Sequence, residues 1–154
     1  MNAKYPPIGT VSHATMRSED LIPAFMDVLR VFSPERHAEL EQEQPEELED
    51  GDYPDVETAS GWLNDVLWTA MEEIAPPYCY FGASEGDGSD YGFWPSIESL
   101  EEDARYKEGV IKVADTSEVP ANWRDYVMFV SDHGNVTLYE TTDSGNLEEI
   151  WSVV

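Results

Sequence analysis

Residues 56–81 read VETASGWLNDVLWTAMEEIAPPYCYF, and this stretch decides the fold class. Its first part carries apolar side chains at three- and four-residue spacing, which predicts an amphipathic helix with a wide apolar face. Those side chains are Val56, Ala59, Trp62, Leu63, Val66, Leu67, Ala70, Met71 and Ile74. Pro76 and Pro77 end the helix, and the apolar period then falls to two over 78–81, which predicts a strand. The chain therefore combines helices with a sheet.

Toward the N-terminus the pattern remains helical. Residues 1–17 are expected to form an irregular lead-in, because two prolines and a glycine interrupt them. A first helix is predicted from its apolar face, which is formed by Leu21, Phe25, Val28, Leu29 and Phe32. A short second helix follows at about 37–42, after a Ser-Pro start signal. Residues 43–55 are expected to be a solvated acidic loop, so 18–75 forms a helical part that this loop interrupts.

Toward the C-terminus the pattern is that of strands. Residues 82–90 are expected to be a turn-rich loop and 97–106 a short helix. Strands are predicted at 91–94, 109–114, 126–131, 136–141 and 147–153. DHGN at 132–135 and DSGN at 143–146 are typical of hairpin turns, because Gly and Asn tolerate a positive φ.

The order of these elements predicts the fold class. Helices followed by a run of strands favour an α+β fold, in which N-terminal helices pack on an antiparallel β-meander. The predicted organisation is a single domain over residues 1–154, with the mainly β part at 78–154, because a chain of 154 residues is the usual size of one domain.

The overall charge excludes two classes of partner. The chain holds 33 Asp and Glu against 8 Lys and Arg, which gives a formal net charge of −25. Direct binding to nucleic acid is excluded, because affinity for phosphate comes from basic side chains, and docking on anionic membranes is excluded for the same reason. With one cysteine, no signal peptide and no long apolar segment, the sequence predicts a protein of the reducing cytoplasm.

The charge is also unevenly distributed. Residues 37–104 contain 20 acidic side chains and no Lys or Arg. Mixed signs would give the same solubility with less repulsion, so we consider a functional reason, namely that the carboxylates imitate the phosphates of a nucleic acid. The predicted partner-binding residues are Glu39, Glu41, Glu43, Glu46, Glu47, Glu49, Asp50, Asp52, Asp55, Asp87, Asp90, Tyr91 and Trp94. A solvated acidic surface without a partner is the alternative.

Three blocks of sequence are distinctive. They are PPYCYFG at 76–82 with GDGSDYGFWP at 86–95, SHATMRSEDLIPAF at 12–25, and SDHGNVTLY at 131–139. In these blocks the chain resembles a family of small uncharacterised proteins that bacteriophages and related mobile elements encode. The resemblance implies a small accessory protein in the cytoplasm of a bacterial host, and it implies no activity and no functional residues.

Catalytic, metal and cofactor sites are not predicted. The loop at 85–90 offers Glu85, Asp87, Ser89 and Asp90 as oxygen ligands for a divalent cation, but a tight turn between two strands explains the same residues. Cys79 is expected to be a packing residue, because an acidic environment raises the pKa of a thiol.

The predicted function is therefore non-catalytic. We expect an acidic inhibitor of a basic host protein, one that binds nucleic acid or acts in host defence. The alternatives are a toxin-neutralising immunity-type protein, an assembly protein, and a small metal-binding module or enzyme built on the 85–90 loop.

Overall fold

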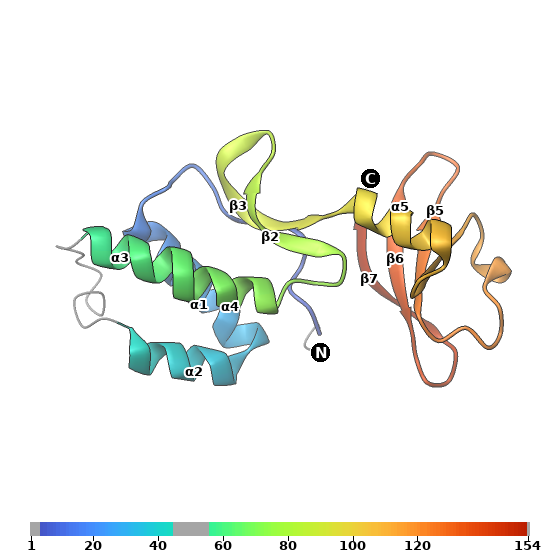
Figure 1. The fold of residues 1–154 in the computed structure, drawn as a ribbon, viewed down its shortest axis with the longest axis horizontal. Helices are drawn as coiled ribbons and strands as arrows, with labels where there is room; N and C mark the ends of the chain where they lie inside the picture. The colour runs from blue at the N-terminus through green and yellow to red at the C-terminus, as the bar shows by residue number, and fades with distance from the viewer. Residues whose placement is uncertain (1–3, 45–55, 154) are drawn as a thin grey trace. The chain divides into compact units, whose positions relative to one another are not determined.

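The computed structural model of the chain describes residues 4–44 and 56–153, and it has an α+β fold (Figure 1). The predicted fold class is thus confirmed. The chain divides into two compact units, which we call the N-terminal unit (Met1–Trp94) and the C-terminal unit (Pro95–Val154). The single domain expected over 1–154 remains a prediction.

The N-terminal unit packs helices on a small antiparallel sheet. Its helical elements are α1 (Ser18–Phe32), α2 (Pro34–Glu43), α3 (Val56–Trp62), the π-helical segment η2 (Leu63–Leu67) and α4 (Trp68–Glu73). Its strands are β1 (Gly9–Ser12), β2 (Cys79–Ser84) and β3 (Asp87–Pro95), in the order β1-β3-β2. The helix α1 contacts α2, α3, η2, α4 and β1, so it is the centre of the unit (Figure 1).

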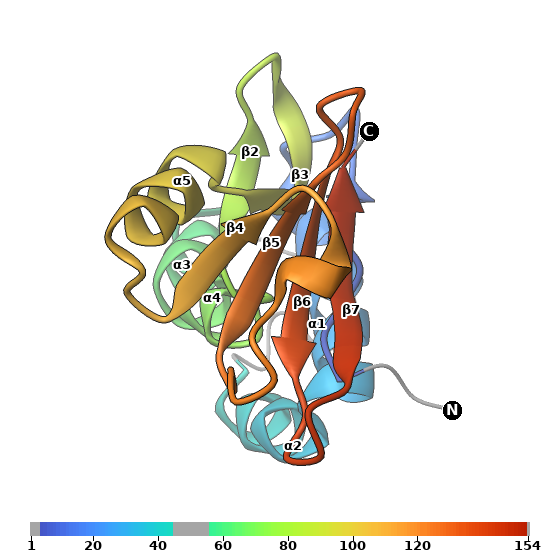
Figure 2. The same cartoon turned by 90° about the vertical axis from the view of Figure 1, so that its right-hand side faces the viewer.

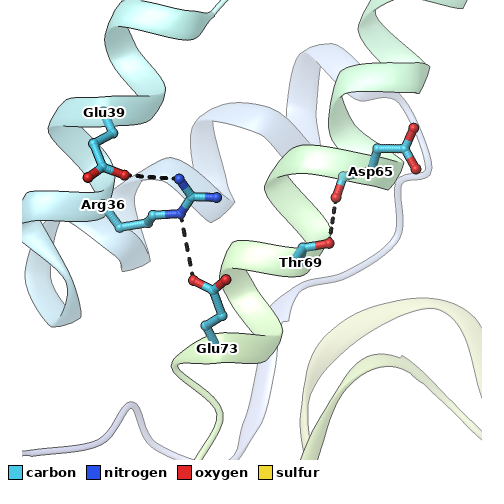
Figure 3. A network of polar contacts seen from close by, with 5 residues as sticks. All are labelled: Arg36, Glu39, Asp65, Thr69 and Glu73. Atoms are coloured by element: carbon cyan, nitrogen blue, oxygen red, sulfur yellow. Dashed lines mark hydrogen bonds and ion pairs between the residues drawn. The ribbon is translucent and has the colours of Figure 1, made fainter.

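The helix predicted from the apolar stripe is present and is nearly continuous from α3 through α4. Backbone angles at Trp62 and Trp68 are helical, so η2 is a wider turn within one helix and not a break. The N–H of Trp68 donates to the carbonyl of Leu63, five residues earlier, and the hydroxyl of Thr69 donates to the carbonyl of Asp65 at 2.7 Å (Figure 3). Most of the stripe is buried: Ala59, Leu67, Ala70 and Met71 are inaccessible to solvent, Trp62 and Leu63 are nearly so, and Val66 and Ile74 are partly buried.

Aromatic side chains form much of this core. The ring of Phe25 lies 4.9 Å from that of Phe81, and Trp68 lies 4.9 Å from Phe81 and 5.8 Å from Tyr91, all in edge-to-face geometry. Such contacts contribute beyond the apolar area that they bury. They join α1 and α4 to strands β2 and β3.

Two expectations about the N-terminal unit are corrected. The lead-in contains β1, whose Thr10 lies opposite Gly92 of β3. A side chain at Gly92 would place its Cβ 2.0 Å from the carbonyl oxygen of Gly9, so only glycine permits this pairing. The expected loop at 82–90 is mostly strand, because β2 and β3 continue to a turn at 85–86.

The C-terminal unit is a four-stranded sheet with one helix. Its elements are α5 (Ile97–Tyr106), β4 (Val110–Val113), the 3-10 helix η3 (Thr116–Glu118), β5 (Tyr126–Val130), β6 (Val136–Thr141) and β7 (Leu147–Val153). The strands lie in the order β4-β5-β6-β7, and α5 packs against β4 (Figure 2). Its core includes Leu100, Val110, Met128, Leu138 and Trp151.

The predicted meander holds for three of these four strands. β5, β6 and β7 are antiparallel neighbours, whereas β4 and β5 are parallel. The reason is the long connection through η3, since a crossover of about a dozen residues allows the chain to return in the same direction. Both predicted hairpin turns are present, with Gly134 at φ 82° and Gly145 at φ 90°.

Candidate protein-binding surface

The helices α2 and α4 expose a group of carboxylates that we call the acidic helix surface. It consists of Glu35, Glu39, Glu41, Glu43, Glu72 and Glu73, all of which are exposed. α2 buries Leu40 and α4 buries Ala70 and Met71, and the acidic side chains of both helices occupy the solvent side.

Arg36 connects the two helices within this surface. Its Nη1 donates to Glu39 Oε2 at 3.0 Å, and its Nε lies 3.6 Å from Glu73 Oε2 (Figure 3). The guanidinium is 28% exposed, whereas the two carboxylates are 62% and 55% exposed. One cation therefore serves two carboxylates, which leaves a clear excess of negative charge on α2 and α4.

Three predicted partner-binding residues, Glu39, Glu41 and Glu43, belong to the acidic helix surface. Six others lie outside the described residues, namely Glu46, Glu47, Glu49, Asp50, Asp52 and Asp55. In the sequence they follow α2 directly and precede α3. Nothing in the described structure tests their role.

The β2–β3 hairpin separates the two predicted aspartates. Asp87 and Asp90 are three residues apart in β3, so their side chains leave opposite faces of the strand. Asp87 accepts hydrogen bonds from Ser89 N at 3.0 Å and Ser89 Oγ at 2.8 Å, and these bonds, with a smaller contribution from His13, hold the pKa of Asp87 below its usual range. Oδ1 of Asp90 is buried without a hydrogen-bond partner.

This geometry bears on the metal-binding alternative. Among residues 4–44 and 56–153, no group of three or more His, Cys, Asp and Glu side chains is placed to hold a metal ion. In the hairpin at 85–90, Asp87 bonds Ser89, whereas Asp90 leaves the opposite face of β3, so these two carboxylates do not face one common site.

Of the two predicted aromatic contacts, Tyr91 is corrected and Trp94 stays a prediction. Tyr91 is 8% exposed, because its side chain lies on the core face of β3 beside Trp68 and Phe25. Trp94 is half-buried, and its indole N–H donates to the carbonyl of Gly82 at 2.8 Å. The exposed aromatic residue of this hairpin is Tyr80, at 40%. The alternation with the buried Phe81 could have predicted that exposure.

Cys79 is a poor nucleophile in this setting. Burial raises the pKa of its thiol to about 12. A thiol with that pKa holds almost no thiolate at neutral pH, and the thiolate is the reactive form.

The sequence reasoning missed an apolar groove in the N-terminal unit. The groove has a volume of about 480 Å³ and lies between α1 and the segment that leads into β1. Its apolar walls are formed by Pro6, Pro7, Val11, Ala24, Val28, Val31, Phe32 and Phe93. The signal was a second apolar row on α1, namely Ala24, Val28 and Val31 at four- and three-residue spacing, beside the core stripe.

Comparisons with known proteins give no further assignment. No protein-family model, no curated protein and no solved structure matches the chain. None of the helices in the described part of the chain is long and apolar enough to cross a membrane.

Proposed function

We propose that this protein is a non-catalytic inhibitor that binds the basic surface of a nucleic-acid-binding protein through its acidic helix surface. The observation that supports the proposal best is the arrangement around Arg36. Six exposed carboxylates lie on α2 and α4, and the guanidinium of Arg36 contacts two of them, Glu39 and Glu73.

The excess negative charge lowers the stability of the unbound protein, and binding to a basic partner would compensate for that loss. Like charges on one surface repel each other and destabilise the compact state. Residues 1–94 hold 20 Asp and Glu against 4 Lys and Arg, a formal net charge of −16. A basic partner relieves this repulsion, and complementary charge also accelerates association.

The class of partner follows from the same chemistry. Proteins that bind DNA or RNA present rows of Lys and Arg to the phosphates, and carboxylates on successive helical turns offer a similar row of negative charge. The resemblance to phage-encoded proteins adds a setting, in which the partner is a host protein such as a defence nuclease. The proposal includes no metal and no catalytic residue.

The test is capture of partners from bacterial lysate by wild type and two variants. The test variant is Glu41→Lys/Glu43→Lys/Glu72→Lys, which leaves the Glu39–Arg36–Glu73 contacts intact. The matched control is Glu108→Lys/Glu148→Lys/Glu149→Lys, which changes the net charge equally at exposed positions of the C-terminal unit. Captured proteins are identified by mass spectrometry at low and moderate salt, with and without duplex DNA as competitor.

The proposal predicts that wild type captures a nucleic-acid-binding protein. Duplex DNA should displace this protein, moderate salt should weaken its capture, and the test variant should capture on the order of tenfold less of it than the control. Equal capture by both variants overturns the role of the acidic helix surface. One partner that resists both salt and DNA favours the immunity-type alternative instead.

A further inference from the structure

The apolar groove beside α1 lies next to the acidic helix surface. A second hollow of about 230 Å³ shares Pro6 and Phe32 with the groove, and Glu73 lines it. The groove therefore continues toward one of the carboxylates that define the acidic helix surface.

The groove has the features of a docking site for apolar side chains. Its volume is within the range of about 300–1,000 Å³ that ligand sites occupy. Phe93 forms part of its wall while being fully buried, and Val31 at the rim is 56% exposed. An exposed valine beside a hollow with apolar walls gains when a partner covers it.

The form of α1 indicates what kind of segment fits. Ala24, Val28 and Val31 form a ridge of small and branched side chains at helical spacing along one side of the groove. Such a row packs well against the ridges of another helix. An amphipathic helix that lays its apolar side in a groove is a recurring mode of recognition.

The charge around the groove indicates the polar side of that helix. Asp27 lines the groove and is 69% exposed, with Arg30 at 3.4 Å, and the adjoining hollow is lined by both Glu73 and Lys4. The N-terminal unit as a whole is strongly acidic. The net negative charge of the unit repels an acidic helix and attracts a basic one.

We infer that the groove between α1 and the β1 segment receives the apolar face of a basic amphipathic helix of the partner protein. The Lys and Arg side chains of that helix contact Asp27, Glu73 and the acidic helix surface. This inference rests on the proposed function and specifies its partner: a basic surface that includes a helix with apolar side chains.

Two synthetic peptides test the inference on the full chain. The first is a helix-forming peptide of Lys and Leu with Leu at helical spacing, and the second has each Leu replaced by Gln at the same charge. Dissociation constants are measured by titration calorimetry at low and moderate salt. The variant Val31→Asn removes apolar rim area without changing charge, and Met16→Asn is its control, since Met16 is also exposed, at 68%, but does not line the groove.

We expect the Leu peptide to bind on the order of tenfold tighter than the Gln peptide, because buried apolar anchors dominate such interfaces. Val31→Asn should remove most of this difference and Met16→Asn should preserve it. Thermal unfolding of both variants establishes that they fold as wild type does.

The other outcomes separate the inference from the proposed function. If both peptides bind equally and in a salt-sensitive way, the docking role of the groove is overturned and the role of the acidic helix surface is retained. Absence of binding by either peptide at low salt counts against both. If wild type dimerises in sedimentation and Val31→Asn does not, a second copy covers the groove and the inference is overturned.

Discussion

Residues 1–94 carry 20 acidic and 4 basic side chains, whereas residues 95–154 carry 13 and 4. In the C-terminal unit, two of the four cations make contacts that support the fold. Lys112 of β4 lies 3.1 Å from Glu101 of α5, and Arg124 donates to the carbonyls of Ala121 and Trp123. In the N-terminal unit Arg36 joins two helices and contacts two of the six carboxylates of the acidic helix surface.

The hydrophobic cores of the two units also differ in composition. The N-terminal unit concentrates Phe25, Trp68, Phe81 and Tyr91 in one edge-to-face cluster, while the core of the C-terminal unit is mainly aliphatic. A dense aromatic core can stabilise a unit whose surface is electrostatically unfavourable. The aromatic core of the N-terminal unit thus offsets part of the repulsion between the carboxylates on its surface.

The largest expected effect is the loss of stability when a core side chain of either unit is truncated. Phe25→Ala should lower the free energy of unfolding by about 3–5 kcal/mol, because it removes a ring that contacts three others and leaves a cavity. Leu138→Ala is the counterpart in the C-terminal unit, with about 2–5 kcal/mol. Urea unfolding measures both values.

Hydrogen exchange of the same variants tests the domain organisation. If Phe25→Ala reduces protection only in residues 4–94 and Leu138→Ala only in 95–153, the two units unfold separately. If each variant reduces protection throughout, the chain unfolds as the single domain that its length predicts.

The next effect concerns the close approach of β1 to β3. Gly92→Ala should cost about 2–4 kcal/mol and detach β1, because the new Cβ would lie 2.0 Å from a backbone oxygen that cannot move away alone. Gly88→Ala in the same strand meets nothing within 4 Å and should change stability by less than about 1 kcal/mol. Amide protection in β1 reports the detachment, and its retention in Gly92→Ala would contradict the argument.

A smaller effect is expected in the C-terminal unit, at its two hairpin turns. Both turns follow one design, in which Ser131 or Thr142 pairs with an Asn four residues later and the glycine before that Asn has a positive φ. Gly134→Ala should cost about 1–2 kcal/mol from backbone strain. Gly145→Ala should cost at least as much, because its Cβ would also lie 3.4 Å from the guanidinium of Arg124. Thermal unfolding measures both, and no loss in Gly134→Ala would contradict the strain argument.

These two turns also show what the sequence could predict. Their glycines, and the apolar stripe of 56–74, are local patterns that determine a turn or a helix within a few residues. The acidic residues of α2 were predictable as exposed for the same reason, because charge and helical period both appear in the sequence.

Features that depend on distant residues were not predictable. Strand β1 has four residues and forms through pairing with β3, some eighty residues later. The burial of Tyr91 depends on the packing of Trp68 and Phe25 against its face of β3. The apolar groove requires the proline-rich lead-in to lie along the second apolar row of α1, and neither segment alone indicates it.

The smallest expected effect concerns the carboxyl pKa of one aspartate in each unit. Asp87 accepts hydrogen bonds from Ser89, and Asp115 accepts them from Ser117, each two residues later, and these bonds lower the pKa of both carboxyls below the usual 3.8. Because the folded pKa is depressed, the stabilisation is present above the unfolded pKa and is lost as the pH falls through the folded value. Carboxyl chemical shifts titrated by NMR should give both midpoints below 3.8. Replacement by Ala of Ser89 or Ser117 removes the hydroxyl of that serine and should raise the midpoint of its own aspartate while the other stays unchanged. An unchanged midpoint for the aspartate whose serine is replaced would contradict the assignment of its lowered pKa to these local hydrogen bonds.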